Sequence, residues 1–276
     1  MFPPEKILFP VDFSDRCTAA ARMAEIFTGH FQAELTLAHV VEPLPYNDVP
    51  VDLNALGERQ LSGYLVKELK QFDVKRVLLT GDPSFQILEY AKSEDFDLIM
   101  LPTHGYGTFR RLILGSVTAN VLHEASCPVW TGVHMEQVPK LEDIALRRVV
   151  CALDLGSQSC PTLRWAKQLA SEFGADLQVV HVIPETVKDS AFADSAEEQL
   201  LAEAKAKIQG VQQCVGVEAK VTVLAGDIPR AVCGFACREK ADLLVIGRSA
   251  HTGFAGRLRA NAYVIIRQSP CPVVSV

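Results

Sequence analysis

Short apolar runs alternate with longer amphipathic stretches along the whole chain. In the first half, β-branched apolar runs predict buried strands at Lys6–Val11, Glu34–Val40, Lys75–Leu79, Asp97–Leu101 and Pro128–Val133. These runs lack a clean polar–apolar alternation, which is typical of strands covered on both faces of a sheet. Between them the pattern predicts helices at Ser14–Thr28, Asp52–Phe72, Pro83–Ser93 and Gly115–Glu124. Such alternation indicates right-handed crossovers and a parallel sheet.

The second half of the chain repeats the first. Four segments have ordered counterparts at a near-constant offset: 6–15 with 148–157, 33–43 with 175–185, 77–105 with 221–250, and 126–130 with 270–274. The second copy has its own predicted helices at Pro161–Phe173, Ala193–Gln213 and Pro229–Lys240. We therefore predict two tandem α/β domains, each a doubly wound parallel sheet, at residues 1–134 and 147–276, with a polar linker at 135–146.

Composition and charge narrow the class of protein. The 276 residues are 49% hydrophobic and 22% charged, which is typical of a globular protein rather than a disordered one. The unbroken apolar runs are far shorter than the roughly 18 residues that a transmembrane helix needs, and no secretory signal is visible at the N-terminus. A net charge of −6 gives no support for binding to nucleic acid or to an anionic membrane. We expect a soluble, cytoplasmic protein.

The chain has eight cysteines, none of them in a C-x-x-C pair. Cys233 and Cys237 are four residues apart, but no histidine or cysteine pair with zinc-ligand spacing lies nearby. In a chain without a secretory signal a disulfide framework is not expected. We interpret most of the cysteines as small buried residues and predict no metal site.

Open α/β sheets bind ligands beyond the carboxyl ends of their strands, at the point where the strand order reverses. In the first copy a glycine-containing loop follows Pro102 and leads to Gly115-Ser116, which opens a helix. Glycines let main-chain amides approach an anion, and a helix N-terminus adds free donors and a positive dipole end. Asp12, at the end of the first strand, is placed to accept from a ribose hydroxyl or an adenine amine. Spacing alone leaves two readings equally open: a nucleotide site, or glycines that shape a loop and an Asp12 that caps the first helix.

The segments PVDFSD, LAHVVEP and THGYGTFRRLILGSVTANVLHEASCPV together resemble the universal stress protein family, and the resemblance extends over both copies. Nucleotide-binding members share a G-x2-G-x9-G-S/T motif. Here Pro102-x2-Gly105-x9-Gly115-Ser116 matches it at all positions but the first, where proline replaces glycine and removes one amide donor. The resemblance implies a Rossmann-like, adenine nucleotide alpha hydrolase-like fold that binds ATP together with Mg²⁺.

The resemblance also assigns roles to individual residues. It implies that Val11 and Val40 line the base pocket and that Asp12 meets the adenine or the ribose. The residues implied to border the ribose and the phosphates, or to hold the phosphates with a divalent ion, are Pro102, His104, Gly105, Gly115, Ser116 and Val117.

The second copy departs further from the motif. Gly247 keeps the first glycine, but Ala250 stands at the second, and the Gly-Ser position holds Ala260-Asn261 or, with one deletion, Arg259-Ala260. We expect the first copy to bind the nucleotide and the second to bind it weakly or not at all.

Three functions follow from this reading. The first is a non-catalytic, ATP-binding stress-response regulator that acts through its conformation or through a protein partner, with the final strands pairing the two domains or forming a homodimer. The second is a slow ATPase that uses His104 and Arg111, although no Walker A lysine follows Gly115. The third is an interaction scaffold that binds no nucleotide.

Overall fold

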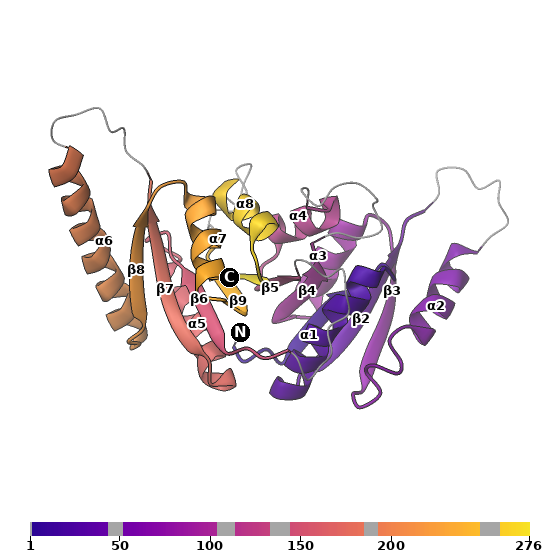
Figure 1. The fold of residues 1–276 in the computed structure, drawn as a ribbon. Coiled ribbons are helices and arrows are strands. Elements are labelled where there is room, and N and C mark those ends of the chain that lie inside the picture. Colours follow the sequence, from indigo (N-terminus) through magenta and orange to yellow (C-terminus); the bar gives the residue numbers. More distant parts are fainter. Residues whose placement is uncertain (1, 44–51, 104–113, 133–143, 185–192, 249–259) are drawn as a thin grey trace. The chain divides into compact units, whose positions relative to one another are not determined.

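The computed structural model describes residues 2–43, 52–103, 114–132, 144–184, 193–248 and 260–276. The chain divides into two compact units, Met1–Ile144 and Ala145–Val276, and each is a parallel sheet with helices on both faces (Figure 1). Of the predicted linker, residues 135–143 lie outside the described residues. Within the described part of the chain, no helix combines the length and the apolar character needed to cross a membrane.

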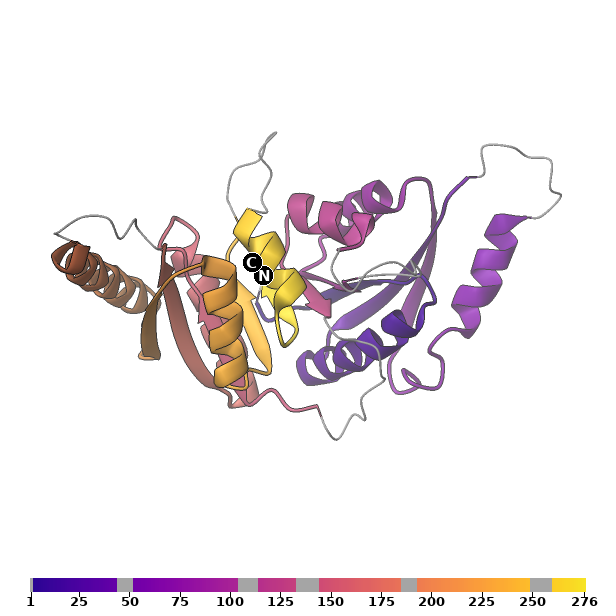
Figure 2. The ribbon, with the colours of Figure 1, turned by 45° about the horizontal axis from the view of Figure 1, so that its top comes forward.

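The first unit has five parallel strands in the order β3-β2-β1-β4-β5. The strands are β1 (Lys6–Pro10), β2 (Glu34–Val41), β3 (Val74–Thr80), β4 (Leu98–Pro102) and β5 (Val129–Gly132). The helices are α1 (Asp15–Phe31), α2 (Leu53–Gly63), α3 (Pro83–Ser93) and α4 (Ser116–Glu124). The order reverses between β1 and β4, so right-handed crossovers place α1 and α2 on one face and α3 and α4 on the other (Figure 2).

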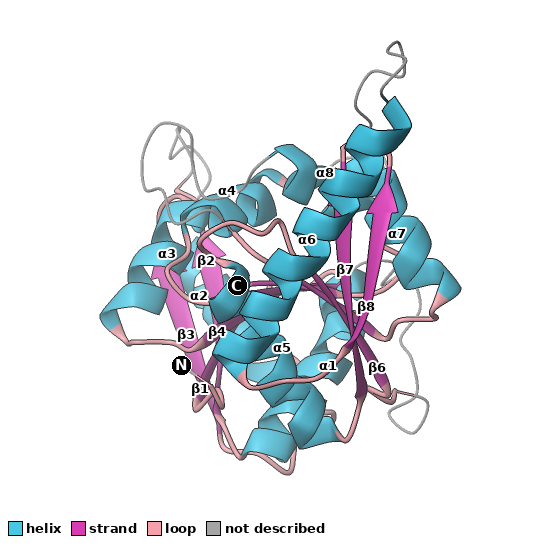
Figure 3. Ribbon diagram, turned by 90° about the vertical axis from the view of Figure 1, so that its left-hand side faces the viewer, coloured by secondary structure: helices cyan, strands magenta, loops and turns pink. Residues whose placement is uncertain are grey.

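The second unit repeats this arrangement with the strand order β8-β7-β6-β9-β10. Its strands are β6 (Arg148–Ala152), β7 (Asp176–Ile183), β8 (Lys220–Ala225), β9 (Leu243–Ile246) and β10 (Val273–Ser275). Its helices are α5 (Ser159–Phe173), α6 (Ala193–Val215), α7 (Ile228–Arg238) and α8 (Ala260–Gln268). Figure 3 shows β7 and β8 between α6 and α7. The predicted fold, two doubly wound α/β units, is confirmed.

The sequence pattern accounts for the core and for the helix starts. All five residues of β4 are buried, as expected for a strand covered on both faces. The side chain of Ser14 accepts a hydrogen bond from the amide of Cys17 at 3.3 Å, which makes Ser14 the N-cap of α1. A Gly-Asp turn starts α3 and again α7: the side chains of Asp82 and Asp227 accept from amides in the first turn of each helix.

The second helix is shorter than the sequence predicts. Its pattern favours a helix over Asp52–Phe72, but α2 ends at Gly63 and only turns follow as far as the next strand. Tyr64 leaves the helix in an extended conformation, and its hydroxyl reaches Thr18 Oγ1 at 3.0 Å in the first turn of α1. The helix therefore ends where Tyr64 makes a tertiary contact with Thr18. The hydrophobic pattern of the local sequence does not predict this contact.

Five of the eight cysteines are buried, in line with the interpretation that most of them fill the core, and all eight are free thiols. Cys214 and Cys237 are exposed instead. Among the residues that the structure describes, no group of three or more histidine, cysteine or acidic side chains is arranged to hold a metal ion.

Candidate functional site

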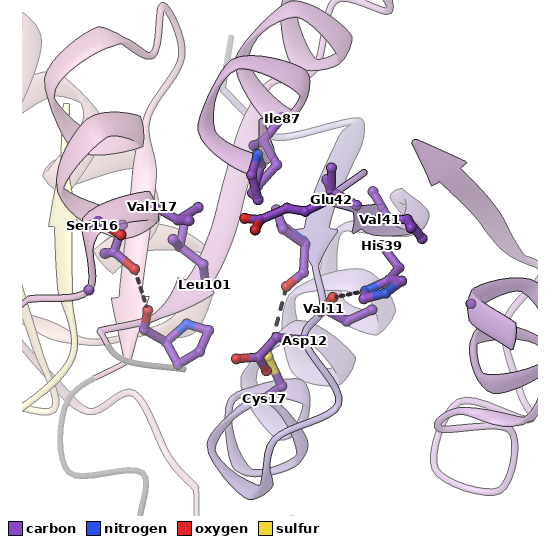
Figure 4. A pocket seen from close by; sticks show the side chains of 18 of the residues that line it. Val11, Asp12, Cys17, His39, Val41, Glu42, Ile87, Leu101, Ser116 and Val117 are labelled. Carbon is purple, nitrogen blue, oxygen red and sulfur yellow. Dashed lines mark hydrogen bonds between the residues drawn. The ribbon is translucent and has the colours of Figure 1, made fainter. Parts of the chain in front are cut away.

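A cavity of about 740 Å³ opens at the carboxyl ends of β1, β2 and β4 in the first unit (Figure 4). This is the point at which the strand order reverses, where doubly wound sheets bind their ligands. Helix α2, the N-terminal half of α3 and the first turn of α4 complete its walls. Its lining residues are Pro10, Val11, Asp12, Cys17, Ala38, His39, Val40, Val41, Glu42, Leu53, Leu56, Gly57, Gln60, Pro83, Ile87, Leu101, Pro102, Leu114, Gly115, Ser116, Val117 and Thr118.

Most of the residues singled out from the sequence meet at this cavity. Those that line it are Val11, Asp12, Val40, Pro102, Gly115, Ser116 and Val117. They come from three strand ends and one helix start, so the fold brings together residues that are far apart in the chain. His104 and Gly105 lie outside the described residues, as does Arg111.

Asp12 has a structural contact and also faces the cavity. Its Oδ1 accepts a hydrogen bond from the amide of Ser14 at 3.0 Å and so braces the turn into α1. The helix cap itself is Ser14, not Asp12. The carboxylate remains half-buried at the cavity wall, where it is able to accept from a ligand. The interpretation of Asp12 as the helix cap is therefore wrong, but its contact in the turn is compatible with a place on the cavity wall.

The thiol of Cys17 lies at the cavity wall beside Asp12. Burial, and then the negative charge of Asp12, raise the pKa of this thiol far above its ordinary value. Cys17 is therefore a neutral thiol at physiological pH and contributes packing surface to the cavity rather than a nucleophile.

The start of α4 forms the opposite wall. Gly115 is its N-cap residue, and among the residues described no side chain caps this end of the helix. The hydroxyl of Thr118 donates to the carbonyl oxygen of Pro102 at 3.0 Å and fixes the first turn to the end of β4. The amides of Ser116 and Val117, in that first turn, have no partner within the helix. This wall therefore offers main-chain donors and the positive end of a helix dipole to a ligand.

The end of β2 supplies a polar main-chain edge. The amide of Val11 donates to the carbonyl of Ala38 at 2.8 Å, and the carbonyl of Val11 accepts from Nδ1 of His39, also at 2.8 Å. Residues of a parallel strand direct their main-chain groups to alternate neighbours, so Val40 turns its N–H and C=O to the same side as Ala38. Strand β1 has already ended there, and Val40 lines the cavity instead.

The sequence reasoning missed the wall that α2 contributes. Leu53, Leu56, Gly57 and Gln60 all line the cavity. Gly57 packs tightly on the sheet: a Cβ there would lie 2.9 Å from Cδ1 of Leu78 and 3.0 Å from Cγ2 of Val41. A glycine in the middle of a predicted helix is the one signal that pointed to this close approach.

The second unit keeps some of these features for reasons of packing. Nδ1 of His181 bonds to the carbonyl of Leu153 at 2.7 Å, as His39 does to Val11. A Cβ on Gly247 would lie 2.8 Å from Oγ1 of Thr162, so α5 accounts for this glycine without any ligand. Residues 249–259, where the motif diverges, lie outside the described residues.

Each unit matches the same family. The model of the Universal stress protein family matches residues 4–131 and, a second time, residues 145–276. The chain belongs to the universal stress protein family. It is a tandem member, since each of its two units matches the family on its own.

Individual universal stress proteins agree with this assignment. Universal stress protein MJ0531 of Methanocaldococcus jannaschii is 32% identical over 139 residues, which are 45% of this chain and 79% of that protein. A universal stress protein of Mycolicibacterium smegmatis is 27% identical over 304 aligned residues, covering 98% of this chain and 96% of its own.

The matching solved structures cover either the whole chain or about half of it. A universal stress protein from Archaeoglobus fulgidus superposes with a TM-score of 0.74 at 20% identity, over 99% of this chain and 98% of its own. A universal stress protein solved in complex with cAMP is 23% identical, with a TM-score of 0.39, over 48% of this chain and 97% of its own.

Proposed function

We propose that this tandem universal stress protein binds an adenine nucleotide, ATP with a divalent ion, in the cavity of its first unit. The observation that carries the proposal is the cavity itself. It lies at the reversal point of the sheet, with Asp12 on one wall and the uncapped start of α4 on another. Its volume of about 740 Å³ is in the range of sites for small molecules and cofactors.

The walls suit the three parts of a nucleotide. The side chains of Val11 and Val40 give an apolar surface for the base, and the N–H and C=O of Val40 match the acceptor and donor on the edge of adenine. Asp12 accepts from a ribose hydroxyl. The first-turn amides of α4 and the hydroxyl of Ser116 bind the phosphates at the positive end of the helix dipole.

The divalent ion reaches the site with the nucleotide. The described residues hold no cluster of three metal-ligating side chains, so the phosphate oxygens supply most of its ligands. Pro102 has no N–H to give, which leaves α4 as the main source of main-chain donors among the residues described.

The nucleotide acts as a regulatory signal in this proposal. It shifts the protein between states only if it binds one of them more tightly, and a protein partner then recognises the favoured state. The cytoplasmic location, and the pairing of domains or chains through their last strands, stay predictions.

Titration calorimetry of MgATP into nucleotide-free protein tests the proposal. The decisive variant is Gly115→Asp. At φ −58° and ψ 146° residue 115 has an N-cap backbone that aspartate favours, and the variant would place a carboxylate at the proposed phosphate position. Circular dichroism checks that the variant is folded. We expect one site per chain in the wild type and no measurable binding in Gly115→Asp.

Two further variants serve as controls. Gly115→Asn adds nearly the same bulk without the charge, and we expect it to bind more tightly than Gly115→Asp. Gly63→Asp adds the same charge at a position with nothing within 4 Å, and we expect wild-type binding. A wild type that binds no nucleotide, or a Gly115→Asp variant that binds normally, would contradict the proposal; the first result would favour the scaffold.

A further inference from the structure

The imidazole of His39 ends the hydrogen-bond ladder between β1 and β2. The last main-chain bond of this ladder runs from the amide of Val11 to the carbonyl of Ala38. In a parallel pair, the next bond would run from the amide of Val40 to the carbonyl of Val11. That carbonyl accepts instead from Nδ1 of His39 at 2.8 Å. A side chain therefore takes the place of one main-chain donor at the edge of the cavity.

Packing holds the imidazole in this position. Phe13 lies against it with ring centroids 4.3 Å apart, and Tyr64 meets Phe13 edge-on at 5.1 Å. Helix α2 also lies near the ring: a Cβ on Gly57 would lie 3.4 Å from Cδ2 of His39, in van der Waals contact. The bond to Val11, the contact with Phe13 and the approach of Gly57 in α2 together restrict rotation of the ring.

The same contacts hold the loop that carries Asp12. Phe13 follows Asp12 directly and has a φ of 64°, a left-handed conformation that a bulky residue rarely adopts. Phe13 packs against both His39 and Tyr64, and these ring contacts offset this strain (Figure 4 shows His39 beside Val11 and Asp12). His39 is thus linked to both polar features of the proposed base and ribose subsite, Asp12 and the edge of Val40.

We propose that His39 is a positioning residue for nucleotide binding. Its bond to the carbonyl of Val11 takes the place of the next main-chain bond between β1 and β2. The N–H and C=O of Val40 therefore stay available to the base. The contact of His39 with Phe13 also holds the loop that carries Asp12. This inference rests on the proposed function.

The second unit contains the equivalent bond, from His181 to Leu153, and a left-handed conformation at the equivalent position, Leu155, with a φ of 58°. It provides a matched control within the chain.

The experiment compares His39→Leu with His39→Asn in the full-length protein. Asparagine presents an N–H near the position of Nδ1, whereas leucine fills similar space without a donor. Binding of MgATP and of MgITP is measured by calorimetry, because ITP carries a carbonyl oxygen in place of the 6-amino group of adenine. We expect His39→Leu to bind MgATP about tenfold more weakly, the equivalent of one lost hydrogen bond, and to lose the preference for ATP over ITP. His39→Asn retains both, and His181→Leu binds as the wild type does.

Amide hydrogen exchange at Val40 in the nucleotide-free protein gives a readout that does not need the ligand. If leucine lets the ladder close, the amide of Val40 exchanges more slowly in His39→Leu than in the wild type. Circular dichroism tests whether each variant is folded. If His39→Leu is unfolded, His39→Asn takes its place. The proposal then requires that His39→Asn has the wild-type exchange rate at Val40 and the wild-type ratio of ATP to ITP affinity.

The outcomes separate the two proposals. A wild type that binds no nucleotide contradicts the proposed function, while the exchange rate of Val40 still tests the ladder role of His39. If the wild type binds and His39→Leu keeps its affinity and its ATP-to-ITP ratio, the positioning role is wrong. Equal weakening for both nucleotides with unchanged exchange at Val40 would also overturn it, because a general loss of packing predicts that result.

Discussion

Single residues of the cavity serve the fold and the proposed site together. Asp12 braces the turn into α1 through the amide of Ser14 and also faces the cavity. His39 fills a ladder position and packs on Phe13. This overlap explains why residue type and spacing alone left a structural and a functional reading of Asp12 equally open: both are compatible with the same side chain.

Replacement of Asp12 by asparagine separates its two roles. Because the amide oxygen still accepts from Ser14, we expect Asp12→Asn to change the free energy of unfolding by less than about 0.5 kcal/mol. Loss of the charged acceptor should weaken MgATP binding about three- to tenfold. Urea denaturation measures the stability. Calorimetry with ATP and 2′-deoxy-ATP measures the binding, since a ribose contact predicts that the variant no longer distinguishes the two nucleotides.

Asp154→Asn is the control in the second unit, where Oδ1 of Asp154 accepts from the amide of Gly156 at 2.8 Å. It should leave nucleotide binding unchanged. ATP affinity in Asp12→Asn equal to that of the wild type, or tighter, would argue that Asp12 has only its structural role.

At the scale of the elements, the duplicated turns before α3 and α7 show what the two copies retain. Gly81 and Gly226 have φ values of 135° and 137°, and each is followed by an aspartate that caps the next helix. Only glycine adopts such a φ without strain. These turns aim their helices in the same way in both units, so they belong to the fold and not to the proposed ligand site.

The turn at Gly226 gives a test that uses a matched pair of glycines. At both Gly226 and Gly210 an added Cβ would have no atom within 4 Å, so a methyl group meets open space at either position. We expect Gly226→Ala to destabilise the second unit by about 1–3 kcal/mol through backbone strain. Gly210→Ala, inside α6, should stabilise it by about 0.5–1 kcal/mol. Urea denaturation measures both; effects of the same sign would contradict the argument.

At the scale of the whole molecule, duplication has kept the fold twice, whereas the sequence motif of the proposed site is matched more fully in the first copy. The histidine bond and the Gly-Asp turn occur in both units. The first glycine of the family motif is present in the second unit, as Gly247, where the first unit has Pro102, and contact with Thr162 accounts for it. The glycines proposed to approach the phosphates have no counterparts in the second copy. A tandem chain allows such a difference between its copies, because one unit can lose its binding site while the other unit still binds the ligand.

Unequal binding predicts unequal thermal stabilisation. At a free MgATP concentration of 100 times Kd, the unit that binds gains about 2.7 kcal/mol and the other gains nothing. Differential scanning calorimetry should therefore show part of the heat absorption moving to higher temperature while the rest stays in place. In Gly115→Asp no part should move. A wild-type transition that moves as a whole would indicate that both units bind or that they unfold together.

The sequence by itself determined the duplication, the two parallel sheets, and the strand ends and helix start at which Val11, Asp12, Val40 and Gly115 meet. These follow from hydrophobic periodicity and from ordered repeats, which are local properties of the chain. The family resemblance drawn from the same residues is also confirmed.

Only the tertiary structure decided which neighbours complete the cavity and why particular residues occupy their positions. The wall formed by Leu53 and Gly57 of α2, the end of that helix at Gly63, and the bond from His39 to Val11 all depend on residues distant in sequence. No local pattern encodes such contacts, because close packing between elements, rather than backbone preference, determines them.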